Sequence, residues 1–280
     1  MTENIQNHPQ ALLINDLAGY GKVALSAMIP VLSHMGVNVY NLPTALVSNT
    51  LDYGKFDILD TTEYMKNTLR VWEELGFSFQ AVSTGFIVNR EQAGLVTEYC
   101  RKQSEKGVRI FCDPIMGDDG KLYNGMNAET VENMKRLVSC ADYIVPNYTE
   151  AAFLTGMEYR EQASEEEIQE MIGRLRGLGA KSVVVTSVEL DGQHQVCGYD
   201  HRTGESFRIP FDYIPVRFPG TGDIFSSVMM GGILRGRSLE QSVKHAMDTV
   251  RGMILKNLEN QDRYKGILIE SCLEVLDEQA

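Results

Sequence analysis

Cysteine is scarce in this 280-residue chain, with five residues that are scattered and never form a C-x-x-C pair. Their odd number and wide spacing argue against a disulfide framework or a structural zinc site and favour a reducing, cytoplasmic environment. Basic residues are also in the minority, since 26 Lys and Arg face 38 Asp and Glu and give a formal net charge of -12. We therefore expect no broad basic surface for nucleic acid or an anionic membrane.

Long apolar runs are missing as well. No uninterrupted apolar stretch reaches the length of a membrane span, and the first ten residues contain neither Lys nor Arg nor an apolar run, so we expect no membrane anchor and no signal peptide. Long linkers, internal repeats and low-complexity segments are not found either. With 43% hydrophobic and 23% charged residues, the chain can bury a large core, and we expect a single domain over residues 1–280.

Apolar runs of strand length alternate with helix-length segments along the chain. This pattern predicts an α/β fold in which a mostly parallel sheet carries helices on both faces and ligands bind at the carboxyl ends of the strands. Two short runs on either side of a turn, at 195–199 and 206–211, predict an antiparallel edge. The predicted buried strands are 11–15, 37–42, 81–84, 109–112, 143–145 and 182–186, and the predicted helices are 61–75, 90–106, 164–178, 221–235, 239–258 and 267–276.

The most informative motif is FPGTGDIF at 218–225, directly before a helical pattern. Gly220 and Gly222 allow φ > 0 and leave their N–H groups unshielded, so these amides and that of Thr221 could converge on an anion. Asp223 would then lie at the helix start, where a carboxylate can accept a proton from an attacking hydroxyl. A glycine turn followed by an Asp N-cap explains the same residues equally well.

Two acidic residues follow the predicted strand 109–112 at its carboxyl end. Asp113 comes directly after the strand, and Gly117 permits a turn that can bring Asp118 to the same point. Two carboxylates placed in this way could hold Mg²⁺ directly or through water. An acidic loop that faces only solvent is the alternative.

A second polar pair, Asn147 and Glu150, lies three residues apart at the start of a predicted helix. Both side chains could face one cavity and reach metal-bound water or phosphate, although a helix cap explains Asn147 almost as well. The hydroxyls of Thr186 and Ser187, at the end of the next predicted strand, could meet a nucleotide. This last signal is weak, because Ser and Thr are frequent at strand ends.

Together, these motifs resemble those of the pyridoxal kinases of the ribokinase-like superfamily. The matching segments are NDLAGYG at 15–21, DPIMGD at 113–118, PNYTE at 146–150 and GTGD at 220–223. They follow one another in the family's order over roughly residues 11–258, and their combination is far more specific than any single motif. The segment NLPTALVSN at 41–49 also resembles the stretch after the second strand of those kinases, which favours vitamin B6 over a sugar as the acceptor.

The resemblance implies a three-layer α/β/α fold and transfer of the ATP γ-phosphate to the 5′-hydroxymethyl group of pyridoxal, pyridoxine or pyridoxamine, in pyridoxal phosphate salvage. It also implies Mg²⁺, a monovalent cation such as K⁺ in many members, and a homodimer. The catalytic base is matched by Asp223, and the anion hole by Gly220, Thr221 and Gly222. The remaining matches are Asp113, Asp118, Asn147, Glu150, Thr186, Ser187 and the flap residue Tyr123 for ATP; Asp118, Asn147 and Glu150 for Mg²⁺, partly through water; and Asn15, Thr50, Phe86 and Asp223 for the acceptor.

The sequence departs from this family at the acceptor contacts. Asn15 and Asp16 stand where many pyridoxal kinases have Ser and His. Thr50 and Leu51 replace a His and a Thr, and Phe86 replaces a frequent Tyr. Because such changes would tune the choice of ring, a hydroxymethylpyrimidine kinase or related small-molecule kinase of the same fold is the nearest alternative. A regulatory protein that only binds ATP and B6 is the second, and the presence of every matched acidic residue argues against it.

Overall fold

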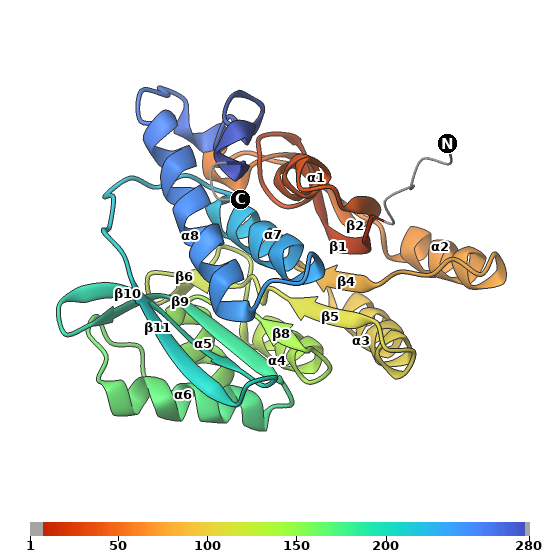
Figure 1. The fold of residues 1–280 in the computed structure, drawn as a ribbon. Coiled ribbons are helices and arrows are strands. Elements are labelled where there is room, and N and C mark those ends of the chain that lie inside the picture. Colours follow the sequence, from red (N-terminus) through yellow and green to blue (C-terminus); the bar gives the residue numbers. More distant parts are fainter. Residues whose placement is uncertain (1–7, 278–280) are drawn as a thin grey trace, which may run out of the picture.

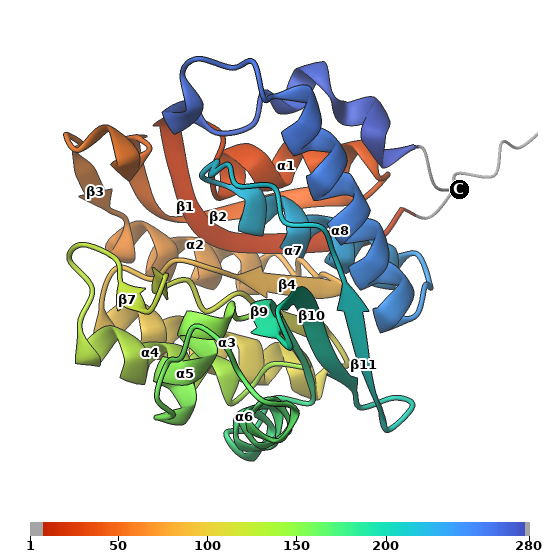
Figure 2. The same ribbon diagram turned by 90° about the vertical axis from the view of Figure 1, so that its left-hand side faces the viewer.

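The computed structural model describes residues 8–277, whose centre is a nine-stranded sheet (Figures 1 and 2). Most of the N-terminal stretch used for the signal-peptide prediction lies outside these residues. The strand order across the sheet is β11, β10, β9, β8, β5, β4, β1, β2, β3. The bounds are β1 (Gln10–Tyr20), β2 (Asn38–Asn49), β3 (Ile58–Asp60), β4 (Ala81–Thr84), β5 (Arg109–Cys112), β8 (Tyr143–Ile144), β9 (Ser182–Leu190), β10 (Gln193–Asp200) and β11 (Glu205–Pro210).

The sheet is parallel in its centre and antiparallel at both edges. Every neighbouring pair from β2 across to β9 runs parallel. By contrast, β3 at one edge and β10 with β11 at the other run antiparallel to their neighbours. Central strands need apolar side chains on both faces, and β4 and β5 have the bounds that their apolar runs predict. The predicted mostly parallel sheet with an antiparallel edge is confirmed.

Helices cover both faces of the sheet, so the fold has three layers, as predicted. Two apolar clusters fill the spaces between the layers, one on each face. One cluster includes α1 (Leu25–His34), α7 (Thr221–Leu234) and α8 (Leu239–Lys256). The other includes α2 (Thr62–Glu74), α3 (Arg90–Glu105), α4 (Ala128–Val138), α5 (Tyr148–Thr155) and α6 (Glu165–Gly177).

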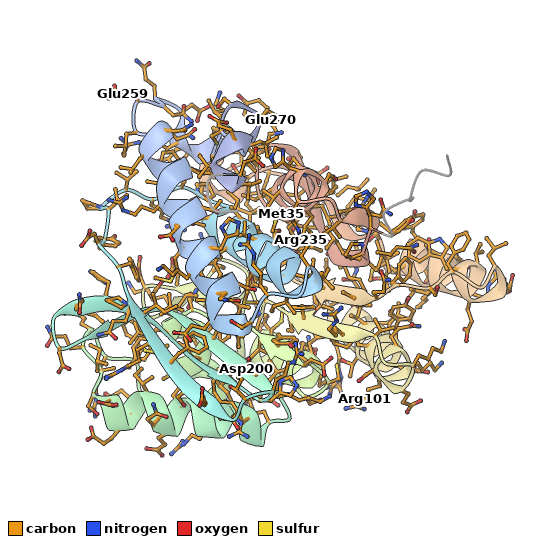
Figure 3. All side chains as sticks on the ribbon, viewed as in Figure 1. Met35, Arg101, Asp200, Arg235, Glu259 and Glu270 are labelled. Carbon is orange, nitrogen blue, oxygen red and sulfur yellow. The ribbon has the colours of Figure 1, made fainter. Side chains whose placement is uncertain are left out.

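Close packing of α1 against α7 depends on small residues in α7. Met35, just after α1, is buried between the two helices (Figure 3). A Cβ on Gly231 would come within 2.7 Å of the Met35 sulfur. Protein interiors pack at near-crystalline density. The thioether of Met35 therefore occupies the space that a side chain at position 231 would need.

Strands β1 and β2 are longer than the apolar runs predict. They continue to Tyr20 and Asn49 and pair with each other along this extension, with a shift of register between Asn15 and Leu17. The extension contains polar residues and Gly19, so its strand conformation is set by pairing with the partner strand rather than by an apolar pattern. A small two-stranded sheet, β6 (Gly117–Asp118) with β7 (Lys121–Leu122), forms directly before Tyr123, the residue matched to the family's flap.

The predicted last helix, 267–276, is wrong. Separate 3₁₀ turns at Ile269–Ser271 and Leu273–Leu276 replace it. The backbone leaves helical geometry at Cys272, which has a φ of -145° and separates the two turns. Apolar residues of this segment still pack into the core. Within residues 8–277, no helix has the length and apolar character needed to cross a membrane.

Candidate active site

Helix α7 begins at the glycine motif. Gly220 is its N-cap residue, in the left-handed conformation with φ 86°, and no side chain of the described residues caps this end. The first N–H groups of an α-helix have no partner inside the helix, so these amides are available to an anion. Gly222 lies inside the first turn and has no positive φ. Of the two glycines, only Gly220 therefore adopts a conformation that favours glycine.

Three segments of the chain meet at Gly220. A Cβ on Gly220 would lie 2.1 Å from the carbonyl oxygen of Lys22. The Lys22 N–H in turn donates to Lys265 O (2.7 Å), and a Cβ on Gly266 would lie 2.8 Å from Pro219 O. The turn at the start of α7 is therefore fixed by backbone contacts that leave no room for a side chain at Gly220.

Asp223 lies in the first turn of α7, and its carboxylate is held by two donors. Ala24 N donates to Oδ2 (2.8 Å), and Asn15 Nδ2 approaches Oδ1 at 3.5 Å. Ala24 has a φ of 48°, a conformation that costs a non-glycine residue roughly 1–2 kcal/mol. Backbone strain at Ala24 thus accompanies the orientation of this carboxylate.

Asn15 links the carboxylate to the neighbouring strand ends. Its Oδ1 accepts hydrogen bonds from Phe86 N (2.8 Å) and Asp16 N (3.0 Å). A Cβ on Gly85 would lie 2.4 Å from the Asn15 amide, so only glycine fits there. The structure therefore brings together Asn15, Phe86 and Asp223, three of the residues matched to the acceptor site.

Several carboxyl groups crowd this corner of the site. Burial raises the pKa of Asp223 to about 6, while the two hydrogen bonds to its carboxylate act in the opposite direction. Burial, and then the charge of Asp223, raise the pKa of both Asp16 and Asp113 to about 7. The hydroxyl of Ser226 donates to Asp113 (2.7 Å) and partly offsets this rise. A proton acceptor that is active near neutral pH fits this environment.

The raised pKa values predict how stability depends on pH. A carboxyl group whose pKa is higher in the folded than in the unfolded state adds stability at low pH, and this is lost as pH rises through the folded value. From the values near 6 and 7 of Asp16, Asp113 and Asp223, we expect ligand-free protein to lose on the order of 6 kcal/mol between pH 5 and pH 8, most of it from Asp16 and Asp113. Urea unfolding at intervals over this range measures the loss. The variant Asp16→Asn should flatten the profile, and stability that rises with pH would contradict the interpretation.

Asn147 and Glu150 form a reciprocal cap at the start of α5. Asn147 N donates to Glu150 Oε2 (2.9 Å), and Glu150 N donates to Asn147 Oδ1 (2.9 Å). The remaining polar atoms bind the next strand end, where Met116 N donates to Glu150 Oε1 and Asn147 Nδ2 donates to Gly117 O. Burial, and then the charge of Asp113, raise the pKa of Glu150 well above its usual range. The pair therefore caps the helix and also lies beside the other carboxylates.

The donor atoms around Asp113 and Asp118 suit Mg²⁺. Among residues 8–277, no group of three or more His, Cys, Asp or Glu side chains could hold a metal ion by itself. Mg²⁺ in phosphotransfer sites usually takes one or two carboxylates and completes its shell with water and phosphate oxygens. A cation would also relieve the repulsion that raises the pKa of Asp113. The residues present thus fit Mg²⁺ that is bound together with a nucleotide.

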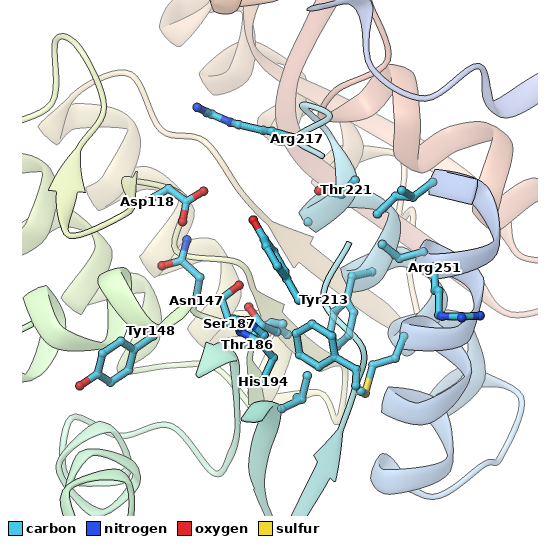
Figure 4. Close-up of a pocket in the computed structure, with 18 of the residues that line it drawn as sticks. Asp118, Asn147, Tyr148, Thr186, Ser187, His194, Tyr213, Arg217, Thr221 and Arg251 are labelled. Atoms are coloured by element: carbon cyan, nitrogen blue, oxygen red, sulfur yellow. The ribbon is translucent and has the colours of Figure 1, made fainter. Parts of the chain in front are cut away.

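A cavity of about 1040 Å³ opens beside the N-terminus of α7 (Figure 4). Its lining comes from the carboxyl ends of β5 and β8, from β9 to β11, and from α7 and α8. All residues predicted for ATP, the anion hole and catalysis lie on its wall: Asp113, Asp118, Tyr123, Asn147, Glu150, Thr186, Ser187, Gly220, Thr221, Gly222 and Asp223. Thr186 is not at a strand end, because β9 continues to Leu190 and Thr186 forms a bridge with Asn147.

One end of the cavity is aromatic and apolar. The rings of His194 and Tyr213 lie 4.6 Å apart between centroids, and Phe211 lies 5.7 Å from His194. Met247 and Val250 of α8 complete this wall. Figure 4 shows Tyr213 between Thr221 on one side and Asn147 on the other. A flat aromatic ligand could be accommodated here.

Thr50 does not face a ligand site in this structure. Its side chain is only 2% exposed, and its hydroxyl donates to Tyr264 O (2.6 Å). Its methyl group fills the space that Gly21 leaves, because a Cβ on Gly21 would lie 2.3 Å from it. The assignment of Thr50 to the acceptor site is therefore corrected, and its position indicates a role in holding the C-terminal turn against the β1 extension.

Several residues at the site were not assigned a role from the sequence. Asp16 belongs to a matching motif and follows the apolar run of β1, so a search for acids at strand ends could have found it. Ala24, Tyr213 and Arg217 gave no comparable signal. Their positions depend on a positive φ in one loop and on the course of the loop after β11, which no short motif encodes.

The chain is similar to known proteins over most of its length. A family model described as phosphomethylpyrimidine kinase matches residues 25–267. Pyridoxal kinase from Arabidopsis thaliana is 29% identical over 69% of this chain and 64% of its own length. Hydroxymethylpyrimidine/phosphomethylpyrimidine kinase from Aquifex aeolicus is 30% identical over 86% of this chain and 92% of its own length.

Solved structures of the same two kinds of kinase are also similar to this chain. A Bacteroides thetaiotaomicron protein assigned as a phosphomethylpyrimidine kinase, in a crystal form with pyridoxal, aligns with TM-score 0.91 and 33% identity over 96% of each chain. Pyridoxal kinase from Lactobacillus plantarum aligns with TM-score 0.86 and 26% identity, also over 96% of each chain.

The three-layer fold, together with these relatives, defines a kinase of the ribokinase-like superfamily. Within it, the chain belongs to the phosphomethylpyrimidine kinase family, and it is also similar to pyridoxal kinases.

Proposed function

We propose that this chain transfers the γ-phosphate of ATP to the 5′-hydroxymethyl group of a vitamin B6 vitamer and so forms the 5′-phosphate in pyridoxal phosphate salvage. The observation that carries this proposal is the position of Asp223, in the first turn of an uncapped helix and on the wall of the large cavity. Similar structures support it, since the Bacteroides thetaiotaomicron protein was crystallised with pyridoxal and Leishmania donovani pyridoxal kinase in complex with ADP and pyridoxine.

Asp223 is the proposed base. It accepts the hydroxyl proton while the acceptor oxygen forms a bond to the γ-phosphorus and the bond from that phosphorus to the bridging oxygen breaks, which releases ADP. The open amides of Gly220, Thr221 and Gly222 stabilise negative charge on the transferred group. A pKa near 6 keeps Asp223 ionised at neutral pH yet basic enough to accept the proton.

The nucleotide is proposed to occupy the cavity beside this base. Its adenine would lie at the aromatic end formed by His194, Phe211 and Tyr213, and its phosphates would point toward α7. The proposed ATP contacts on the remaining wall include Tyr123, Thr186 and Ser187. Mg²⁺, when bound, would neutralise phosphate charge, with Asp118 near it and with Asn147 and Glu150 organising its water shell.

The acceptor ring is proposed to lie near Asn15 and Phe86. The Asn15 amide is fixed beside Asp223, and Phe86 provides an aromatic face. Hydroxymethylpyrimidine is the second candidate acceptor, because the Aquifex aeolicus relative is a hydroxymethylpyrimidine/phosphomethylpyrimidine kinase.

Mass-resolved phosphorylation tests the choice of acceptor. Pyridoxal, pyridoxine, pyridoxamine and hydroxymethylpyrimidine would each be incubated with ATP and Mg²⁺, with and without K⁺. We expect a mass increase of one phosphate on at least one B6 vitamer. If only the pyrimidine is phosphorylated, the acceptor assignment is overturned and the kinase assignment stands; if ATP and pyridoxal bind without turnover, the proposal of a binding protein replaces both.

We further propose that the chain is a single-domain, cytoplasmic protein that forms a homodimer through the β3 edge of its sheet (Figure 2). Leu46 of β2 is paired with Leu59 of β3, and these side chains are 42% and 60% exposed; neighbouring Ile58 is also exposed. Apolar side chains on an open strand edge favour association with another copy.

Light scattering after size-exclusion chromatography measures the oligomeric state. We expect wild-type protein at twice the chain mass of 31.3 kDa and Leu59→Asp shifted toward the monomer. Leu255→Asp, a matched change at an exposed position of α8, should leave the dimer intact. A dimer that survives Leu59→Asp would place the interface elsewhere.

A further inference from the structure

Arg217 lies at the entrance of the cavity, immediately before the turn that contains Gly220. It belongs to the cavity wall together with Asp118 and Thr221. Figure 4 shows its side chain extending from the side of Thr221 across the opening toward the side of Asp118. Arg251, also on the wall, lies on the α8 side of the cavity, away from Asp118. The Arg217 side chain thus extends from beside the first turn of α7 toward the proposed metal ligands, with its guanidinium on the Asp118 side (Figure 4).

The charge around Arg217 is strongly acidic. Asp113, Asp118 and Glu150 line the same cavity as Asp223. Arg217 is the cation whose charge lowers the pKa of Asp118 against the effect of burial. The site must accept a triphosphate despite these carboxylates, so a cation that can approach the transferred group has a large electrostatic effect.

Arg217 is held only loosely in this structure. Its closest acidic partner is Asp52, at 3.8 Å, and the Arg217 side chain is 62% exposed. A long, exposed ion pair of this kind contributes little to stability. The guanidinium can therefore exchange Asp52 for a stronger anionic partner with little loss. Phe218, the next residue, is buried and fixes the backbone from which the side chain extends.

We propose that Arg217 is a catalytic residue of the phosphoryl transfer, which binds the transferred phosphoryl group from the side opposite the α7 amides. This inference rests on the proposed kinase function and adds to it a residue that the motifs do not indicate. The planar guanidinium presents parallel N–H donors that match phosphate oxygens, and its charge stabilises the group as negative charge builds during transfer.

The test compares Arg217→Ala and Arg217→Lys with the wild-type enzyme on whichever acceptor it phosphorylates. For Arg217→Ala we expect kcat to fall about 100-fold, with a smaller change in KM for the acceptor, and added guanidinium chloride at millimolar concentration to restore part of the rate. Arg217→Lys should keep the charge but lose the bidentate geometry, and its kcat should lie between those of the wild-type enzyme and Arg217→Ala. The matched control is Arg263→Ala, an exposed arginine whose guanidinium lies 6.0 Å from the Phe218 ring and outside the cavity lining.

A second readout does not require turnover. Fluoroaluminate bound with ADP and Mg²⁺ mimics the transferred group, so Arg217→Ala should weaken the ADP-fluoroaluminate complex much more than the ADP complex in calorimetric titrations. An unchanged kcat, an equal loss in Arg263→Ala, or equal weakening of both complexes would overturn the role. If the wild-type enzyme phosphorylates the pyrimidine but no B6 vitamer, the acceptor assignment fails while the role of Arg217 is still decided by these measurements.

Discussion

Replacing Asp223 by Asn should lower kcat about 1000-fold while the protein remains folded. Removal of a general base typically costs 10²–10⁴-fold in rate. An amide keeps the shape of the carboxylate and one acceptor oxygen, which can still accept from Ala24 N, but it cannot take up the proton. Steady-state kinetics with the preferred acceptor measures the loss. On the acidic side, kcat/KM of the wild-type enzyme should decline below about pH 6, because protonation then removes the base.

Stability provides the control for this variant. Burial disfavours the Asp223 carboxylate, so Asp223→Asn should leave the free energy of unfolding at pH 8 unchanged or raise it. A variant that loses both activity and stability would point to a structural role. A variant that retains full kcat would show that another group takes the proton.

Gly220→Ala should destabilise the protein by about 3 kcal/mol and lower activity at least 100-fold. The substitution forces a side chain into a φ of 86° and places its Cβ 2.1 Å from Lys22 O, a backbone atom fixed by its own neighbours. The turn must shift to accept it, and the amides then leave the positions that an anion requires. Chemical denaturation and kcat together measure the effect.

Gly222→Ala is the matched control. Gly222 has no positive φ, and a Cβ there meets no atom within 4 Å. Alanine should therefore keep or increase stability by up to about 1 kcal/mol, as expected within a helix. If both alanine variants are equally stable, the tight fit at Gly220 does not govern the turn.

The sequence predicts the central sheet well because its strands are buried on both faces. β4 and β5 are short apolar runs with no other stable environment, and their bounds match the prediction. The extension of β1 beyond Asn15 was not predicted, because it depends on pairing with another segment, β2, and not on an apolar pattern within β1. The predicted last helix does not form for a related reason: the segment packs into the core with Cys272 outside helical geometry, and this tertiary packing overrides the local helical pattern.

The candidate site was predictable where residues follow strand ends in short motifs. Asp113 and Asn147 follow β5 and β8, which are parallel neighbours whose carboxyl ends lie at the same edge of the sheet. Asp223 was found instead from the glycine motif at the start of α7. Thr50 was assigned to the acceptor site by its place in a motif. In the structure its hydroxyl donates to Tyr264 O and so points toward the C-terminal segment. Arg217 could not be found in this way, because its place depends on the path of a loop.

Internal competition between pyridoxal and hydroxymethylpyrimidine is the most direct test of the central proposal. With both alcohols at equal concentration in one reaction with ATP and Mg²⁺, the initial ratio of the two phosphorylated products equals the ratio of their kcat/KM values. The proposed function predicts pyridoxal 5′-phosphate as the main product, and its formation should be lost in Asp223→Asn. A product mixture dominated by phosphorylated pyrimidine would contradict the assignment of vitamin B6 as the acceptor.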